Sequence, residues 1–176
     1  MPSARPRTCH CPTPSEGAEM ATPLRNLERV SWGEIKDSKG SAEAIPFLLN
    51  TVAWGDAATA RAALQDLRER ICQFGFVVEQ ATAATVPFLW ELAELPQVTC
   101  RVQIIQLLRD IAEARQWERT AAAYPKLLNR RENWVGWERE ARQAVRAHRG
   151  TLQHLLAEPD TELVRVTAEL ATTLAD

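Results

Sequence analysis

Apolar residues in this chain recur at the three- and four-residue spacing of amphipathic helices, and one apolar stretch occurs twice. Residues 44–54 read AIPFLLNTVAW and residues 85–95 read TVPFLWELAEL, which places the two copies 41 residues apart. Each copy has a proline near its start, Pro46 or Pro87, and proline suits the first turn of a helix because the amide there has no partner. The pattern therefore predicts the same helix at two places in the chain.

A second amphipathic helix is predicted after each copy. Gly55 and Asp56 interrupt the first copy, and aspartate is a residue type that caps helix N-termini. Pro96 interrupts the second copy. The apolar stripes that follow are Ala60, Leu64, Leu67 and Ile71 in the first case, and Val98, Val102, Ile105, Leu108 and Ala112 in the second. Each unit is thus expected to be a hairpin of two helices, at about 41–72 and 82–115.

The rest of the chain contains a fainter third copy. Leucines precede a break at Pro159–Asp160 and a further apolar stripe follows it, which predicts a third hairpin at about 137–176. The segment 116–136 departs from the 41-residue period and is expected to be an irregular helical insert, followed by a long helix from about Trp137. Strands are not expected, apart from a brief extended link within residues 74–80.

Helical hairpins of this kind cannot bury their apolar stripes alone, so successive copies are expected to stack and share one core. A period near 40 residues with two helices per repeat is typical of HEAT and armadillo repeats. The predicted fold is all-α, a HEAT-like α-solenoid of about three helical hairpins over residues 24–176. If the last hairpin has no neighbour, its exposed apolar stripe would favour self-association through the C-terminal repeat.

The first residues of the chain differ in composition from the rest. Prolines are frequent and apolar residues are few, so a disordered tail is predicted for residues 1–23. The sequence Cys9-His10-Cys11 lacks the spacing and the second ligand cluster that a zinc site needs, and no metal or other cofactor is expected. Neither a signal peptide nor a membrane-spanning run is present, which predicts a cytoplasmic protein without membrane contact.

One stretch carries a family resemblance. Residues 72–89 read CQFGFVVEQATAATVPFL, which is similar to bacterial HEAT-repeat proteins in which a Q-x-G linker precedes a helix of the form A-T-x-x-x-V-P-F-L. The matching residues are Gln73, Gly75, Ala81, Thr82 and Val86-Pro87-Phe88-Leu89. The resemblance covers roughly residues 27–112 and implies an α-solenoid. It implies no active-site residue, because the family carries no agreed activity or catalytic motif.

The net charge of −2 gives the chain as a whole no electrostatic attraction to nucleic acid or to a membrane. The charge is uneven, because residues 101–150 contain eleven Lys or Arg against six Asp or Glu, interleaved with tryptophans. Arginine and tryptophan are enriched among the residues that dominate protein interfaces. The candidate partner-binding residues are therefore Trp117, Arg130, Arg131, Trp134, Trp137, Arg139 and Arg142.

Three interpretations of this segment stay open. The tryptophans can belong to the core with the arginines on helix surfaces, the segment can bind a protein, or it can bind nucleic acid. In the last case the protein would resemble DNA-repair glycosylases, with Glu132 or Glu138 as the catalytic acid. An enzyme subunit that holds a cofactor between its helices is a further alternative without a supporting motif.

The acidic residues favour a structural interpretation. Three carboxylate pairs with a spacing of three residues are expected on solvated helix faces beside arginines: Glu91 and Glu94, Asp66 and Glu69, and Asp110 and Glu113. Nucleotide-binding, hydrolase and metalloprotease motifs are all absent from the sequence. The sequence therefore favours a non-enzymatic HEAT-repeat scaffold for protein–protein interaction, with a protein as the expected partner.

Overall fold

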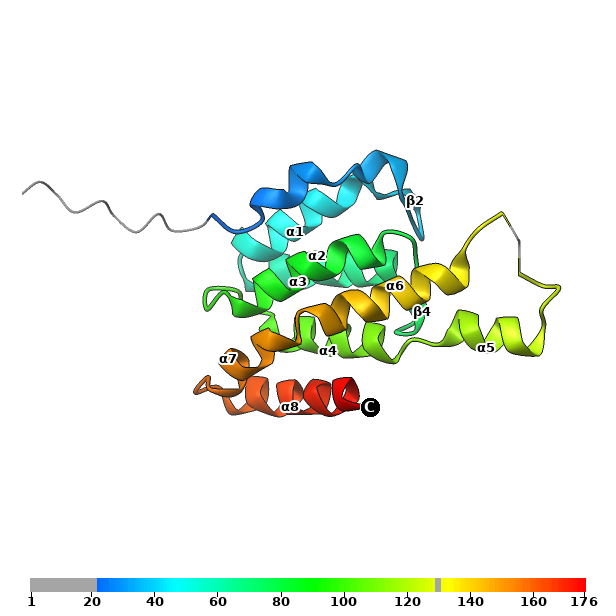
Figure 1. The fold of residues 1–176 in the computed structure, drawn as a ribbon. Coiled ribbons are helices and arrows are strands. Elements are labelled where there is room, and N and C mark those ends of the chain that lie inside the picture. Colours follow the sequence, from blue (N-terminus) through cyan, green and yellow to red (C-terminus); the bar gives the residue numbers. More distant parts are fainter. Residues whose placement is uncertain (1–21, 129–130) are drawn as a thin grey trace, which may run out of the picture.

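The computed structural model describes residues 22–128 and 131–176, and these residues are mostly helical (Figure 1). Eight α-helices run through them: α1 Ile45–Trp54, α2 Ala57–Ile71, α3 Thr82–Glu94, α4 Arg101–Glu113, α5 Gln116–Ala123, α6 Trp134–Ala147, α7 Leu152–Leu156 and α8 Thr161–Ala175. Short 3-10 helices complete the helical part: η1 Arg25–Arg29, η2 Trp32–Glu34, η3 Ala42–Ala44 and η4 Arg149–Thr151. The predicted all-α class is confirmed. Of the predicted tail, only Thr22 and Pro23 are among the described residues.

The helices pack in pairs and in two layers. α1 packs against α2 and α3 against α4, so the segments 41–72 and 82–115 each contain two packed helices. α1, α3 and α6 lie in sequence in one layer, and α4 and α8 lie side by side in the other (Figure 1). An ion pair between Arg68 of α2 and Asp110 of α4 joins α2 to this second layer. The third segment is less regular, because α7 is a short helix that packs on α8.

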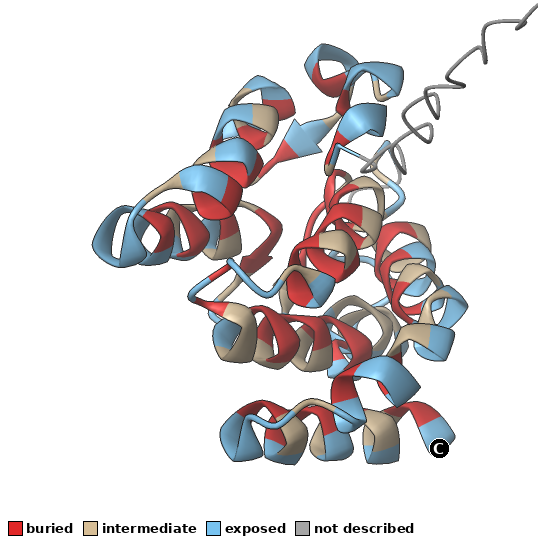
Figure 2. Cartoon of the chain, turned by 90° about the vertical axis from the view of Figure 1, so that its left-hand side faces the viewer, coloured by how far each residue is buried: buried red, intermediate tan, exposed pale blue. Residues whose placement is uncertain are grey.

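The core consists mainly of the predicted apolar stripes, whose buried faces turn toward one another in Figure 2, and Leu24, Leu27 and Trp32 of the N-terminal segment add to it. All four stripe residues of α2 are buried, and in α4 only Val102 is partly exposed. Trp90 of α3 is among the largest fully buried side chains of the described residues. Full burial of one leucine or isoleucine side chain stabilises a fold by about 1.5–3 kcal/mol, so these stripes supply the main favourable contribution to folding.

Side-chain caps fix the starts of three helices. Asp56 accepts a hydrogen bond from the Thr59 amide at 2.8 Å, as predicted, and Asp160 accepts from two amides at the start of α8. Asn133 accepts from the Gly136 amide at the start of α6. Each cap satisfies a helix amide that has no partner within the helix.

The two matching prolines occupy different helical positions. Pro46 lies in the first turn of α1, whereas α3 begins earlier and contains Pro87 in its interior. The extra turn of α3 is tied down by the buried Thr82 hydroxyl, which donates to the Ile71 carbonyl at 2.5 Å and accepts from the Glu79 amide at 2.9 Å. Thr82 therefore connects the end of the first helix pair to the start of the second.

The expectation of no strands is wrong. β1 (Lys36–Asp37) pairs with β2 (Gly40–Ser41), and β3 (Cys72–Gln73) pairs with β4 (Val77–Val78), both antiparallel. β4 lies within the segment 74–80 for which an extended link was expected. The short ladders depend on tight turns, in which Gly40 has a φ of 124° and Gly75 a φ of 81°. Two-residue strands carry too little apolar periodicity to be visible in the sequence.

The C-terminal third also differs from expectation. The helix expected from about Trp137 begins at Trp134 and ends at Ala147, and η4 separates it from α7. α8 turns Leu163, Val166, Leu170 and Leu174 inward and exposes no large apolar side chain. Leu156 of α7 is the exposed large apolar side chain of this segment, and self-association through the C-terminal repeat stays a prediction.

Candidate functional site

The three candidate tryptophans form one cluster at the junction of α5 and α6. The ring centroids of Trp117 and Trp134 lie 4.7 Å apart, and those of Trp134 and Trp137 lie 4.8 Å apart. Trp137 is buried, the other two are half-buried, and the Trp117 indole donates to the Val78 carbonyl of β4 at 3.1 Å. The cluster packs α5, α6 and β4 together, so the expected binding role of Trp137 is replaced by a structural one.

Arg142 is likewise a structural residue, because it is 8% exposed and saturated by partners within the chain. Its guanidinium donates to the Ala114 carbonyl at 2.7 Å, to Glu118 at 2.5 Å and to Glu138 at 3.3 Å. Glu138 is fully buried and also accepts from the backbone amides of Trp117 and Glu118. The pair thus holds the N-terminus of α5 against α6, and Arg142 is not free to meet a partner.

The remaining candidates lie at the surface or outside the described residues. Arg130 falls outside them, and Arg131 and Arg139 are exposed. Arg139 is close enough to Glu118 to act on it electrostatically. The hydrogen bond from Arg142 lowers the pKa of Glu118 below its usual range, and Arg139 contributes a smaller effect in the same direction.

A groove of about 470 Å³ lies beside this junction, and three arginines line it. Arg115 and Arg119 come from the start of α5 and Arg146 from the end of α6, and Phe76 lies on the rim. Arg115 is 3.7 Å from Glu118, whereas the side chains of Arg119 and Arg146 form no ion pair with any residue that the structure describes. We call this hollow, defined by Arg115, Arg119 and Arg146, the arginine groove.

Two of the three acidic residues of the arginine groove already have basic partners. Asp110 forms an ion pair with Arg68, and Glu113 lies 3.8 Å from the Arg109 guanidinium. The third, Asp176, follows the end of α8. Two guanidinium groups without ion-pair partners among the described residues, those of Arg119 and Arg146, then stand against one carboxylate, Asp176, so the hollow has a small surplus of positive charge in a chain whose net charge is −2. Guanidinium groups bind carboxylates and phosphates with paired, charge-assisted hydrogen bonds.

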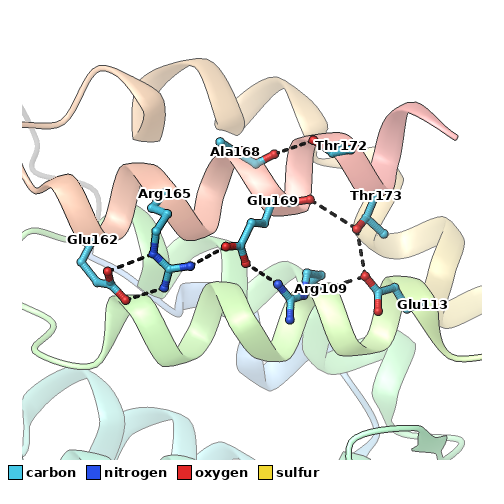
Figure 3. Close-up of polar contacts among 8 residues, drawn as sticks. All are labelled: Arg109, Glu113, Glu162, Arg165, Ala168, Glu169, Thr172 and Thr173. Atoms are coloured by element: carbon cyan, nitrogen blue, oxygen red, sulfur yellow. Dashed lines mark hydrogen bonds and ion pairs between the residues drawn. The ribbon is translucent and has the colours of Figure 1, made fainter.

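Ion pairs cover the outer face of α4 and α8, and Figure 3 shows them as a continuous chain of contacts. Arg165 binds Glu162 and Glu169 on its own helix, and Arg109 of α4 also binds Glu169. Thr173 of α8 donates to Glu113 of α4 at 3.0 Å. The carboxylates with three-residue spacing on α4 thus lie beside arginines, as the charge pattern predicted.

The residues named for catalysis in the nucleic-acid alternative are engaged within the fold. Glu138 is fully buried, and Glu132 binds the Lys36 amine at 2.8 Å. Burial raises the pKa of the Cys72 thiol to about 12, which makes it a poor nucleophile at neutral pH. Within residues 22–128 and 131–176, no group of three or more His, Cys, Asp or Glu side chains is placed to hold a metal ion.

The basic segment was predictable from the sequence, but the arginines that converge in the structure are not the ones that were expected. Arg115, Arg119 and Arg146 all lie within residues 101–150, but Arg139 and Arg142 of the same segment were expected instead. The four-residue spacing of Arg115 and Arg119 places both on one helical face and was the available signal.

Comparisons of the chain with models of known protein families, with curated proteins and with solved structures gave no match. In the part of the chain that the structure describes, none of the helices has both the length and the apolar character needed to cross a bilayer.

Proposed function

We propose that this chain is a non-enzymatic HEAT-like α-solenoid that binds an acidic segment of a partner protein in the arginine groove. The observation that supports the proposal is the presence of Arg119 and Arg146 in one hollow without ion-pair partners among the described residues. Most arginines of the second layer have such partners, as the contacts on α2, α4 and α8 show.

The arrangement of the helices supports the solenoid part of the proposal. Paired helices follow one another along the chain, and their first and second members lie in separate layers. The resemblance of residues 72–89 to bacterial HEAT-repeat proteins points in the same direction. Stacked hairpins present a rigid extended surface whose side chains can vary without loss of the core, which suits a binding scaffold.

The environment of the arginines favours a protein over a nucleic acid. Single-stranded nucleic acid binding generally requires aromatic rings on which bases can stack. The tryptophans nearest in sequence are packed on one another, and the exposed rings beside the groove are those of Phe74 and Phe76. The net charge of −2 gives the chain as a whole no attraction to a phosphate backbone, which favours the protein partner. The carboxylates of an acidic polypeptide can be bound by guanidinium groups alone, and the groove contains these groups.

A panning experiment with a random peptide library on the immobilised full chain tests this proposal. We expect the selected peptides to be enriched in Asp and Glu, and to lose binding to the double variant R119E/R146E. The matched control is R29E/R61E, which makes the same change in net charge at two exposed arginines of η1 and α2. This control should bind the selected peptides as the wild type does.

Several outcomes would overturn the proposal. Failure to enrich any peptide, enrichment without acidic residues, or equal binding by R119E/R146E and the control would each do so. Displacement of the peptides by a single-stranded oligonucleotide at low concentration, with steep salt dependence, would favour nucleic acid instead.

A further inference from the structure

The hairpin between β3 and β4 carries two exposed aromatic side chains at its tip. Phe74 is 77% exposed and Phe76 is 47% exposed, and their ring centroids lie 6.2 Å apart. Gly75 lies between them at the turn. Large apolar side chains at this exposure contribute little to folding, because their surface stays in water.

Phe74 also has an unfavourable backbone conformation. Its φ is 56°, in the left-handed region where the Cβ atom crowds the following carbonyl and where glycine and asparagine are the usual residues. A residue with a bulky side chain costs about 1–2 kcal/mol in this conformation. The Phe74 ring is 77% exposed and its ring contact is with Phe76, which is itself 47% exposed, so burial offsets little of that cost. An unfavourable backbone conformation that gains little stability within the fold indicates that the Phe74 side chain binds something outside the chain.

The fold holds this turn in a defined position. A Cβ atom on Gly75 would lie 3.3 Å from the Arg68 guanidinium, so the turn rests directly on the ion pair between Arg68 and Asp110. Phe76 faces the arginine groove, and Phe74 faces a neighbouring hollow of about 330 Å³ that Lys39 and Glu69 also line. The two rings therefore form a ridge between two hollows, and one of these hollows is the arginine groove.

We propose that Phe74 and Phe76 bind large apolar side chains of the same acidic segment whose carboxylates enter the arginine groove. This inference rests on the proposed function of the groove and specifies its partner: an acidic segment of a protein that also carries leucine or aromatic residues. The positive charges of Arg119 and Arg146 bind the acidic side chains of the partner segment. The rings of Phe74 and Phe76 beside them bind its apolar side chains. Aromatic side chains bury a large area at low entropic cost, which is why they recur in binding sites.

Two fluorescently labelled peptides and fluorescence anisotropy test the inference. One peptide contains only glutamate and serine, and the other contains glutamate with leucine at every third or fourth position. We expect the wild type to bind the leucine peptide about tenfold more tightly, which corresponds to about 1.4 kcal/mol. The variant F74N/F76S should bind both peptides equally, and asparagine at position 74 keeps the turn intact because it accepts the left-handed conformation.

The variants separate the failure of this inference from the failure of the proposed function. The control F47S removes an aromatic ring that is 73% exposed on α1, and it should keep the preference for the leucine peptide. If F74N/F76S retains the preference for the leucine peptide while R119E/R146E binds neither peptide, the role of Phe74 and Phe76 is refuted and the proposed function of the arginine groove is supported. If R119E/R146E binds both peptides as the wild type does, both proposals are refuted.

Discussion

At the scale of single residues, charge and burial decide which side chains serve the fold. Arg139 and Arg142 lie three positions apart on α6, and the sequence does not distinguish them because both follow the same Arg and Trp pattern. In the structure Arg142 neutralises the fully buried Glu138, whereas Arg139 faces solvent. The difference arises from the position of α5, which lies too far along the chain for local spacing to predict.

The substitution R142M should destabilise the protein strongly. It keeps most of the apolar stem but leaves the Glu138 carboxylate buried without its guanidinium, and removal of one member of a buried pair costs about 3–5 kcal/mol. The free energy of unfolding from urea denaturation, followed by circular dichroism, measures the loss. The matched variant R139M should change it by less than about 0.5 kcal/mol. Equal losses in the two variants would contradict the assigned role of Arg142.

Glu79 should make stability depend on pH. Burial, with smaller effects from Asp37 and Glu132, raises the pKa of Glu79 from 4.5 to about 7. Between these values the folded chain binds more protons at Glu79 than the unfolded chain does. Its contribution to stability is therefore complete below about pH 4.5, is lost as pH rises through 7, and changes little above that.

The variant E79Q measures this contribution. Between pH 5 and pH 8, the free energy of unfolding of the wild type should fall by about 2 kcal/mol relative to that of E79Q. Urea denaturation at several pH values gives both curves, and all other titrating groups are common to the two proteins. Parallel curves would show that Glu79 titrates at its ordinary pKa.

At the scale of elements, local signals predicted helices well and short strands poorly. The cap at Asp56 was visible in the sequence because a cap depends on one residue and the few amides that follow it. The extended segment at 74–80 was visible only as the short run Phe76, Val77 and Val78. Its pairing with Cys72 and Gln73 depends on a turn in which both Phe74 and Gly75 have positive φ.

The β3–β4 turn should become more stable when its first central residue is changed to suit the backbone. F74N relieves a left-handed phenylalanine, and the free energy of unfolding should rise by about 0.5–1 kcal/mol. G75A should lower it, because a φ of 81° is unfavourable for alanine and the added Cβ atom approaches Arg68. Thermal or urea denaturation of the two variants measures whether the free energy of unfolding rises in F74N and falls in G75A. A loss of stability in F74N would mean that the ring supports the fold.

At the scale of the whole molecule, the 41-residue repeat predicted the helix pairs at 41–72 and 82–115, since each copy carries its own apolar stripes. The arginine groove was not predictable in the same way. Its arginines come from α5 and α6, and α4, the end of α8 and the β3–β4 hairpin complete its lining, so only the packing of these five elements brings the residues together. The 41-residue repeat does not continue through that region. The sequence therefore shows that arginines are frequent there but does not show which of them lie close together.

The most direct test of the central claim is the affinity of the glutamate and leucine peptide for R119E/R146E compared with R29E/R61E. Both double variants change the net charge of the chain by the same amount, so a difference between them reports the position of the arginines. We predict that R29E/R61E binds as the wild type does and that R119E/R146E loses at least about tenfold in affinity, or about 1.4 kcal/mol. Equal affinity in the two variants would contradict it.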